Sequence, residues 1–498
     1  MRTHITEWRL VLVMAAVLIA VSCAPHPEEE REVRDERTPL DEYVAEEDPH
    51  YEYTVHQTVE GEGYTGYIVH MVSQQWLTTA EVEEPIWWHW LHVAVPEEVE
   101  HDTALLFIGG GSNTGDPPTD VPAEIAQAAV LTNSIAAEIR QVPNQPLTFV
   151  DDPGSPRYED WQIAYAWDQF LNTGDTRWPS RLPMTKSAVK AMDTVADLVA
   201  QEEHGGHEVN SFTVAGGSKR GWTSWTTAAV DERVEAVMPA VIDLLNIEPS
   251  FIHHYSALGF WAPAVGDYEE MEIFEWMGTE ENRELMRIVE PYNYRHRLTM
   301  PKYIVNSTGD QFFLPDSSQF YFGDLEGEKY LRYVPNTDHG LGGSDAREVM
   351  LAYYHAVLTD ADRPRFSWTI NEDRSIRVEP EDEPDTVTLW RATNPEARDF
   401  RRDVIGEAWE PTELAADDDG TYLAEVEEPD EGWTAFMVEL RYPGAEFAPL
   451  KFTTDVVVVP DELPYEDEIP EVLPHADEID WEPEPLPVTR NAGPPQHD

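Results

Sequence analysis

The segment Phe212-Thr-Val-Ala-Gly-Gly-Ser-Lys-Arg-Gly-Trp222 carries most of the information about the fold of this 498-residue chain. Its first four residues are apolar or β-branched, which predicts a buried strand. Residues 222–230 predict a helix directly after the turn. Ser218 therefore stands in a tight strand-to-helix turn among small neighbours, and such a turn exposes a side chain at the edge of a sheet.

The glycines around Ser218 form a variant of the Gly-x-Ser-x-Gly turn that presents the nucleophile of serine hydrolases. Gly216 occupies the expected position, but Arg220 stands two residues after Ser218, and Gly221 comes one residue later. This departure weakens the motif, and an ordinary glycine-rich turn is the alternative. A phosphate-binding loop is disfavoured because the chain lacks the Gly-x-x-x-x-Gly-Lys-Ser/Thr pattern.

Asp310 and His339 are the partners that a serine nucleophile needs. Residues 303–306 and 330–334 predict successive strands, and each of the two side chains follows one of them. The chain order Ser, Asp, His is that of α/β-hydrolases. His339 would take the proton of Ser218, and Asp310 would orient the imidazole. Asp243, after a predicted strand at 234–241, is an alternative acid; a turn cap at Asp310 and a surface position for His339 are the structural alternatives.

The oxyanion donors are expected to be backbone N–H groups of Lys219 and of Gly110 or Gly111, in the loop after a predicted strand at 103–108. The side chains of Lys219 and Arg220 either attract an anionic group of the substrate or pair with nearby acids.

An aromatic-rich stretch at 246–298 separates two strands of the predicted sheet and indicates a cap over the site. Substrate-lining positions are assigned to Arg220 and, in the cap, to His253, His254, Tyr255 and Trp261. No metal or other cofactor is expected, because adjacent histidines rarely bind one ion together and no third ligand stands at a useful spacing.

Strands and helices alternate over residues 103–358, which predicts a mostly parallel sheet flanked by helices. The expected fold is an α/β-hydrolase domain at 49–365 with a cap at 246–298. Short alternating strands predict a C-terminal β-sandwich at 366–460. Residues 461–498 are rich in proline and acid and are predicted to be disordered.

The N-terminus resembles the signal peptide of a bacterial lipoprotein over residues 1–23. Arg2 and Arg9 precede an apolar run at 10–21, and Cys23, the one cysteine of the chain, follows it. Lipidation of Cys23 would anchor an exported protein to a membrane, with the acidic segment 24–48 as a linker. A plain signal peptide cut nearby is the alternative. A single cysteine also excludes a disulfide scaffold.

The formal net charge of −64 disfavours binding to nucleic acid. Only six of the 33 basic residues are lysines. An acidic surface poor in lysine suits concentrated salt, where repulsion between carboxylates is screened, so we expect a salt-adapted protein. The alternative is that the acidic ends of the chain alone cause the imbalance.

Several long segments between residues 40 and 460 follow in the order of one known protein family. They are Ser73-Gln-Gln-Trp76, Ala104-Leu-Leu-Phe-Ile-Gly-Gly-Gly-Ser112, Trp178-Pro-Ser-Arg-Leu-Pro-Met-Thr-Lys186, Gly216-Gly-Ser-Lys-Arg-Gly-Trp222, Pro301-Lys-Tyr303, Gly309-Asp-Gln-Phe-Phe-Leu-Pro-Asp-Ser-Ser-Gln-Phe-Tyr321 and Glu328-Lys-Tyr-Leu-Arg-Tyr-Val-Pro-Asn336. Over these segments the chain resembles the PhoPQ-activated pathogenicity-related proteins. The resemblance implies an exported α/β-hydrolase with a C-terminal β-domain, and links of that family to antimicrobial-peptide resistance make a peptidase or amidase conceivable. The turn around Ser218 is also similar to that of glucuronoyl esterases, which favours a carboxylic ester. The acidic ends of the chain depart from the family pattern.

The sequence thus predicts an exported serine hydrolase that acts on an ester or on a peptide or other amide by acyl transfer. The alternative is a catalytically silent binding or signalling protein of the same fold at the cell surface, since a fold alone does not establish activity.

Overall fold

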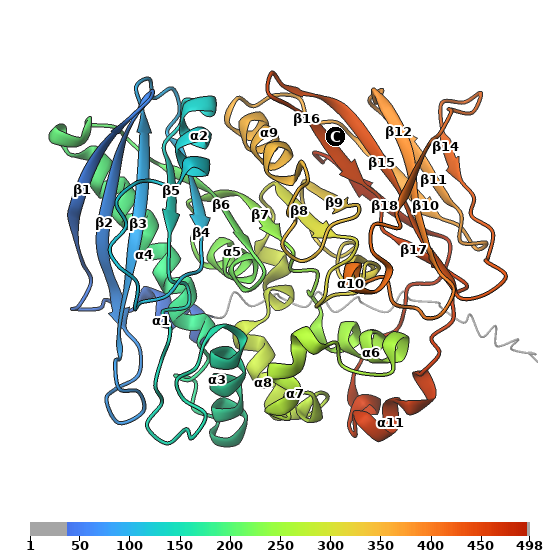
Figure 1. Cartoon of the computed structure of the whole chain (residues 1–498), viewed down its shortest axis with the longest axis horizontal. Coiled ribbons are helices and arrows are strands. Elements are labelled where there is room, and N and C mark those ends of the chain that lie inside the picture. The colour runs from blue at the N-terminus through green and yellow to red at the C-terminus, as the bar shows by residue number, and fades with distance from the viewer. Residues whose placement is uncertain (1–36, 496–498) are drawn as a thin grey trace, which may run out of the picture. The chain divides into compact units, whose positions relative to one another are not determined.

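The central sheet of the computed structural model, which describes residues 37–495, has a parallel core with antiparallel strands on either side (Figure 1). The parallel neighbours are β5-β4-β6-β7-β8-β9, and β1-β2-β3 extend the sheet at the β5 side. The bounds are β1 (Glu52–Gly61), β2 (Tyr64–Gln75), β3 (Ile86–Pro96), β4 (Thr103–Ile108), β5 (Ala136–Ile139), β6 (Ser211–Gly217), β7 (Val234–Ala240), β8 (Lys302–Ser307) and β9 (Lys329–Val334).

Helices connect and cover these parallel strands. α4 packs against α1 and α5, whereas α2 packs against α9. A parallel sheet needs such cover because both of its faces are apolar. Together with the strand-to-helix turn after β6, this arrangement confirms the predicted α/β-hydrolase fold. The helices are α1 (Pro39–Ala45), α2 (Ala123–Thr132), α3 (Glu159–Thr173), α4 (Arg181–Ala200), α5 (Lys219–Val230) and α9 (Ala346–Leu358).

Residues 247–297, between β7 and β8, form the helical segment that we call the cap. Its α-helices are α6 (Ile247–Leu258), α7 (Gly266–Glu270) and α8 (Glu280–Val289). They lie with α3 below the sheet in the view of Figure 1. Aromatic side chains of the cap pack on one another, for example Phe274 on Trp261 with ring centroids 4.0 Å apart.

The C-terminal part is a pair of antiparallel sheets, one of which continues the central sheet. β16 pairs with β9 at Thr453 and Leu331, and β15, β12 and β13 follow in order. The other sheet has the order β14-β11-β10-β18. The bounds are β10 (Phe366–Ile370), β11 (Ile376–Pro380), β12 (Thr386–Asn394), β13 (Glu410–Glu413), β14 (Tyr422–Ala424), β15 (Trp433–Ala445), β16 (Ala448–Thr453), β17 (Val457–Val459) and β18 (Val488–Ala492), with the short helix α10 (Arg402–Ile405).

The acidic tail after residue 460 is ordered through residue 495, so the predicted disorder there is wrong. β18 pairs along β10, and α11 (Ile469–Val472) lies next to α6. The Tyr465 N–H donates to the Ser256 carbonyl at 2.9 Å, and Leu473 is 1% exposed. Composition averages over the segment, whereas a few well-spaced apolar side chains and one strand pairing are enough to hold it.

The predicted linker also enters the fold from Thr38 onward. Thr38 and Asp41 form a reciprocal capping box at the start of α1, and Leu40 is fully buried. Arg297, at the end of the cap, pairs with Asp41 at 2.8 Å. The predicted signal peptide, Cys23 and the first part of the linker lie outside the described residues. In the part of the chain that is described, no helix is long and apolar enough to cross a membrane.

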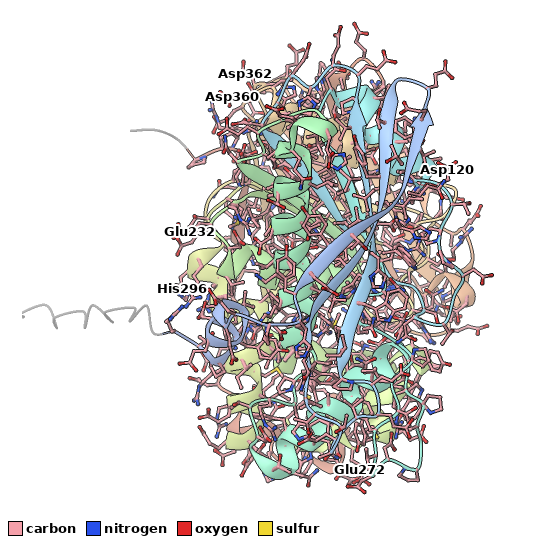
Figure 2. The ribbon with its side chains drawn as sticks, turned by 90° about the vertical axis from the view of Figure 1, so that its left-hand side faces the viewer. Asp120, Glu232, Glu272, His296, Asp360 and Asp362 are labelled. Atoms are coloured by element: carbon pink, nitrogen blue, oxygen red, sulfur yellow. The ribbon has the colours of Figure 1, made fainter. Side chains whose placement is uncertain are left out.

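Acidic side chains stand at the surface across the whole folded body, as Figure 2 illustrates. Asp120, Glu232, Glu272, Asp360 and Asp362 are all exposed and come from separate parts of the chain. The negative charge is therefore not confined to the ends of the sequence.

Replacing Leu473 by alanine tests the order of the tail. Deleting a buried leucine side chain typically costs about 2–5 kcal/mol, so we expect a lower urea midpoint for Leu473→Ala. The control is Glu471→Ala, at an exposed position of α11, the helix that ends just before Leu473. Equal midpoints for the two variants would show that the tail does not pack on the body.

Candidate active site

Ser218 lies in a strained turn between β6 and α5. Its φ is 57° and its ψ is −129°, a conformation that residues with a side chain rarely adopt. The Ser218 N–H donates to the Ala240 carbonyl at the end of β7, at 2.8 Å. A serine held in this way at the carboxyl end of a parallel strand has the geometry of a hydrolase nucleophile.

Two glycines make the turn possible, and they explain why the motif departs from the usual spacing. A Cβ on Gly216 would lie 2.6 Å from the Arg220 carbonyl oxygen. A Cβ on Gly221 would lie 2.9 Å from Ile242 Cγ2 and about 3 Å from the carbonyl oxygens of Gly216 and Ala240. Gly221, rather than position 220, is thus the residue that brings α5 into contact with the sheet.

Asp310 and His339 form a direct pair. His339 Nδ1 lies 2.8 Å from Asp310 Oδ2 and 2.9 Å from Oδ1. Asp310 is buried and also accepts the Phe312 N–H at 2.7 Å, which fixes the carboxylate. An Nδ1–H donated to a carboxylate leaves Nε2 of the imidazole unprotonated and able to accept a proton.

Asp243, the alternative acid, is engaged elsewhere. Its two carboxylate oxygens accept the hydroxyls of Tyr321 and Tyr333, each at 2.6 Å. Burial raises the pKa of Asp243 to about 8, against the effect of these two hydrogen bonds. Of the two candidate acids, Asp310 is the one that contacts His339.

Two aromatic side chains, Phe312 and Phe313, connect the Ser218 pocket with His339. Phe312 packs on the His339 ring with centroids 4.3 Å apart, and Phe312 and Phe313 line the same pocket as Ser218. The Ser218 hydroxyl makes no hydrogen bond to any described residue. Hydrogen bonds of this kind are often absent before substrate binds and form in the complex.

The pocket at Ser218 is enclosed mainly by apolar side chains of α3, α5 and the cap. Its volume is about 50 Å³. Such a concave, apolar site with a few polar groups is typical of small-ligand binding. The lining residues are Asp160, Trp167, Arg181, Ser218, Lys219, Trp222, Ile242, Leu244, Ile247, Phe251, Val265, Tyr268, Ile273, Phe274, Met277, Asn282, Met286, Phe312 and Phe313.

The predicted oxyanion donors leave adjacent strands at the same edge of the sheet. Ile108 at the end of β4 is in register with Gly216, so the loop with Gly110 and Gly111 lies beside the Ser218 turn. Lys219 is the first residue of α5, where helix N–H groups lack intrahelical acceptors. The N–H groups of Gly110 and Gly111 likewise donate to no described residue.

The side chains of Lys219 and Arg220 pair with acids of α3. Lys219 Nζ lies 2.9 Å from Glu159 and 2.8 Å from Asp160, and Arg220 lies 2.8 Å from Glu159. Burial would raise the pKa of Glu159, but Arg220 and Lys219 together lower it to about 2. The sequence left two roles open for these side chains, attracting an anionic group of the substrate or pairing with nearby acids. The structure shows that they pair with nearby acids.

The other residues to which we assigned substrate-lining positions stand outside the pocket wall. Trp261 stacks behind Phe274, and Tyr255 packs on Trp261. His254 stacks on Trp261 and accepts the Ala262 N–H at 3.1 Å, and burial lowers its pKa to about 3. These three residues therefore support the wall and do not line it.

His253 and Arg220, the other two residues predicted to line the substrate pocket, also lie outside its wall. His253 pairs with Asp316 at 3.0 Å, and Arg398 pairs with the same carboxylate at 2.6 Å. Arg220 lies across Gly110, where a Cβ would approach its guanidinium to 2.7 Å. No group of three potential metal-ligating side chains occurs within residues 37–495.

Helices α3 and α4 contribute pocket-lining residues that the sequence did not predict. Trp167 and Asp160 come from α3, and Arg181 is the first residue of α4. Arg181 could have been recognised as a candidate site residue, because it lies in residues 178–186, one of the segments that carry the family resemblance. Spacing in the sequence cannot show that α3 and α4 meet at the Ser218 turn.

Comparisons with known proteins show which family this chain matches. The sequence profile of the PhoPQ-activated pathogenicity-related protein family matches residues 40–401. Autocrine proliferation repressor protein A of Dictyostelium discoideum is 36% identical over 457 residues, which is 86% of this chain and 92% of that protein.

Among solved structures, an acetyl xylan esterase from Paenibacillus sp. R4 is similar to 65% of this chain over 96% of its own, at 15% identity and a TM-score of 0.47. A glucuronoyl esterase from Solibacter usitatus is similar to 64% of this chain over 91% of its own, at 12% identity and a TM-score of 0.39.

The close approach at Gly221 is testable by adding a methyl group. Alanine normally stabilises a helix by about 1 kcal/mol relative to glycine, but here the new Cβ meets backbone oxygens, so Gly221→Ala is expected to lower the urea midpoint. Overpacking of this kind costs about 1–3 kcal/mol. Gly217→Ala is the matched control, because a Cβ there meets only Val241 Cγ2 at 3.8 Å. A midpoint raised by Gly221→Ala would contradict this account of the turn.

Proposed function

The chain belongs to the PhoPQ-activated pathogenicity-related protein family, and we propose that it is a serine hydrolase that cleaves an ester or amide by acyl transfer. The observations that carry the proposal are the ion pair between buried Asp310 and half-buried His339 and the strained turn of Ser218. Such strain persists only where the surrounding structure enforces it, and it concentrates at functional sites.

In the proposed reaction, Ser218 Oγ attacks the substrate carbonyl carbon while its proton passes to His339 Nε2. Asp310 keeps the imidazole oriented and stabilises its positive charge. The negative charge on the carbonyl oxygen is held by N–H groups of Lys219 and of the Gly110–Gly111 loop, each worth about 3 kcal/mol of transition-state stabilisation.

Collapse of this intermediate breaks the bond to the leaving group, which takes the proton from His339. The acyl group stays on Ser218 until a water molecule, deprotonated by His339, releases it as the acid. The apolar pocket formed with the cap would exclude bulk water from the acyl group, which strengthens the electrostatic interactions inside.

We propose that the protein acts at the cell envelope. The basic, apolar and cysteine-bearing start of the sequence supports export and a lipid anchor on Cys23. A membrane partner through this anchor is therefore part of the proposal, together with a small-molecule or peptide substrate.

A second candidate function is a signalling protein whose hydrolase site is silent. It is favoured by the name of the Dictyostelium discoideum relative, a proliferation repressor, and by the Ser218 hydroxyl having no hydrogen-bond partner among the described residues. The two candidates differ in whether Ser218 reacts with an electrophile.

A fluorophosphonate probe distinguishes them, because it reacts only with an activated serine. We expect covalent labelling of the wild-type protein and none of Ser218→Ala, measured by mass spectrometry of the intact chain. The control is Ser224→Ala, at a buried serine of α5 whose hydroxyl donates to the Arg220 carbonyl. An unlabelled wild type, or equal labelling of Ser218→Ala, would exclude the hydrolase proposal.

The role of Asp310 is testable against Asp243. Replacing the acid of such a triad by its amide lowers turnover by about 10⁴-fold, because the imidazole adopts the wrong tautomer; we expect a loss of this order for Asp310→Asn in the rate of labelling or ester hydrolysis. Asp243→Asn should change the rate little, since a carboxyl group with a pKa of about 8 is already neutral at pH 7. The reverse order of effects would make Asp243 the catalytic acid.

A further inference from the structure

Arg181 is a buried cation in the wall of the Ser218 pocket. Its side chain is 3% exposed, and its Nη1 donates to the Lys219 carbonyl at 2.9 Å. The guanidinium lies over the Trp222 ring, 4.4 Å from the centroid. Its Nε is buried and has no hydrogen-bond partner. A charged residue that lines the pocket thus keeps one donor without an acceptor, although Tyr268 also contacts its side chain.

The carboxylates near Arg181 are already used by other cations. Glu159 and Asp160 hold Lys219, and Glu159 also holds Arg220. Asp160 accepts the Tyr268 hydroxyl as well, at 3.1 Å. Within residues 37–495, no carboxylate forms an ion pair with Arg181.

An unpaired buried cation is costly. Burial lowers the pKa of Arg181, and the nearby Tyr268 and Asp160 only partly oppose this effect. A guanidinium nevertheless stays charged in a protein. Removing such a charge from water without a partner costs several kcal/mol, so the group needs a compensating anion or a function.

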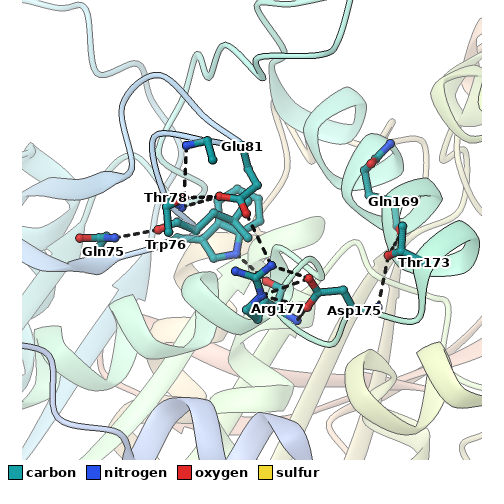
Figure 3. A network of polar contacts seen from close by, with 10 residues as sticks. Gln75, Trp76, Thr78, Glu81, Gln169, Thr173, Asp175 and Arg177 are labelled. Carbon is teal, nitrogen blue, oxygen red and sulfur yellow. Dashed lines mark hydrogen bonds and ion pairs between the residues drawn. The ribbon is translucent and has the colours of Figure 1, made fainter.

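A polar network orders the segment that leads into α4, the helix that begins at Arg181. The Trp76 indole N–H donates to the Arg177 carbonyl at 3.0 Å, and the Arg177 side chain pairs with Asp175 at 2.6 Å and reaches Glu81 at 3.5 Å (Figure 3). The network ties the loop after β2 to the segment that leads into α4. Arg181 itself is oriented by its contacts with the Lys219 carbonyl and the Trp222 ring, and a donor positioned before the ligand arrives is the arrangement expected of a specificity residue.

The counter-ion of Arg181 must be small and must come from the substrate. The pocket volume of about 50 Å³ favours a short ligand over a long one. A carboxylate fits, because it is planar and matches the donor geometry of a guanidinium. The leaving group must depart, whereas the acyl group stays bonded to Ser218. Because Ser218 lines the enclosed pocket, the pocket is the place for the acyl group.

We infer that Arg181 is a specificity residue that binds a carboxylate on the acyl group, so that the substrates are esters or amides of short dicarboxylic acids. The apolar lining contacts the methylene groups between the two carbonyl carbons. This inference rests on the proposed function of Ser218. Lys219 and Arg220, although closer in sequence to Ser218, do not recognise the anion because their charges are already paired.

The test compares two esters that differ in one group, monomethyl succinate and methyl butyrate, by titration of the acid released. Both are measured at one high ionic strength, where repulsion between the anion and this acidic protein is screened. We expect a higher kcat/KM for the succinate ester. Arg181→Met should lower the ratio of the two kcat/KM values by about 10- to 100-fold, as for the loss of a charged hydrogen bond.

The ratio is independent of the fraction of enzyme that folds, and two variants sharpen it. Arg181→Lys keeps the charge and should retain part of the preference. Arg398→Met removes another buried arginine, one that pairs with Asp316 outside the pocket, and should leave the ratio unchanged. A ratio that Arg181→Met does not change would overturn the inference while leaving the hydrolase proposal intact.

Calorimetric binding to Ser218→Ala separates the inference from catalysis. Succinate is expected to bind this variant more tightly than butyrate and to lose that advantage when Arg181→Met is added. No binding of succinate would overturn the inference. Binding of succinate by Ser218→Ala, with no hydrolysis of either ester by the wild type, would support the anion site and contradict the proposed reaction.

Discussion

The contact of α5 with the sheet at Gly221 is the constraint on which the rest of the site depends. Because no side chain separates Gly221 from the carbonyl oxygens of Gly216 and Ala240, the chain reverses sharply enough to hold Ser218 at φ 57°. The same turn sets the first N–H of α5 and the Lys219 carbonyl, to which Arg181 donates. The proposed nucleophile, the expected oxyanion donor and the buried cation are therefore positioned by one packing contact.

The cations next to the Ser218 turn are paired with carboxylates of a single helix, α3. Two neighbouring acids of α3, Glu159 and Asp160, neutralise Lys219 and Arg220. Arg220 then lies on the Gly109–Gly111 loop and donates to the Val142 carbonyl, which joins the two loops of the site. The cations next to Ser218 thus serve first to hold the site together, and Arg181 is left with an unused donor.

The C-terminal part reaches the site region through the tail. One of its sheets continues the central sheet through β16, and the tail returns from it to pack on α6 of the cap before adding β18 to the second sheet. A Cβ on Gly259 would meet the Tyr465 ring, and one on Gly278 would meet the His475 carbonyl. The cap is therefore covered by a segment that composition alone classifies as unstructured. Phe251 and Phe274 of the cap line the pocket, and Trp261 packs on both of them.

Local patterns in the sequence determined the order of strands and helices, the turn at Ser218, and the positions of Asp310 and His339 after successive strands. These features depend on neighbouring residues and on the rule that parallel strands present their carboxyl ends at one edge. Chain order alone left both Asp310 and Asp243 as candidates for the acid. In the structure two tyrosines donate to Asp243 and His339 contacts Asp310, and these contacts depend on the packing of distant segments.

The tertiary structure decided everything that depends on contacts between distant segments. The sequence predicted an aromatic-rich cap over the site, but it could not tell which of these aromatic residues line the pocket. His254, Tyr255 and Trp261 lie behind the pocket wall, since the side of a helix that faces a pocket is set by its packing. Arg181 reached the pocket from α4, 37 residues before Ser218 in the sequence. The order of the tail likewise followed from strand pairing and from the burial of Leu473, neither of which average composition records.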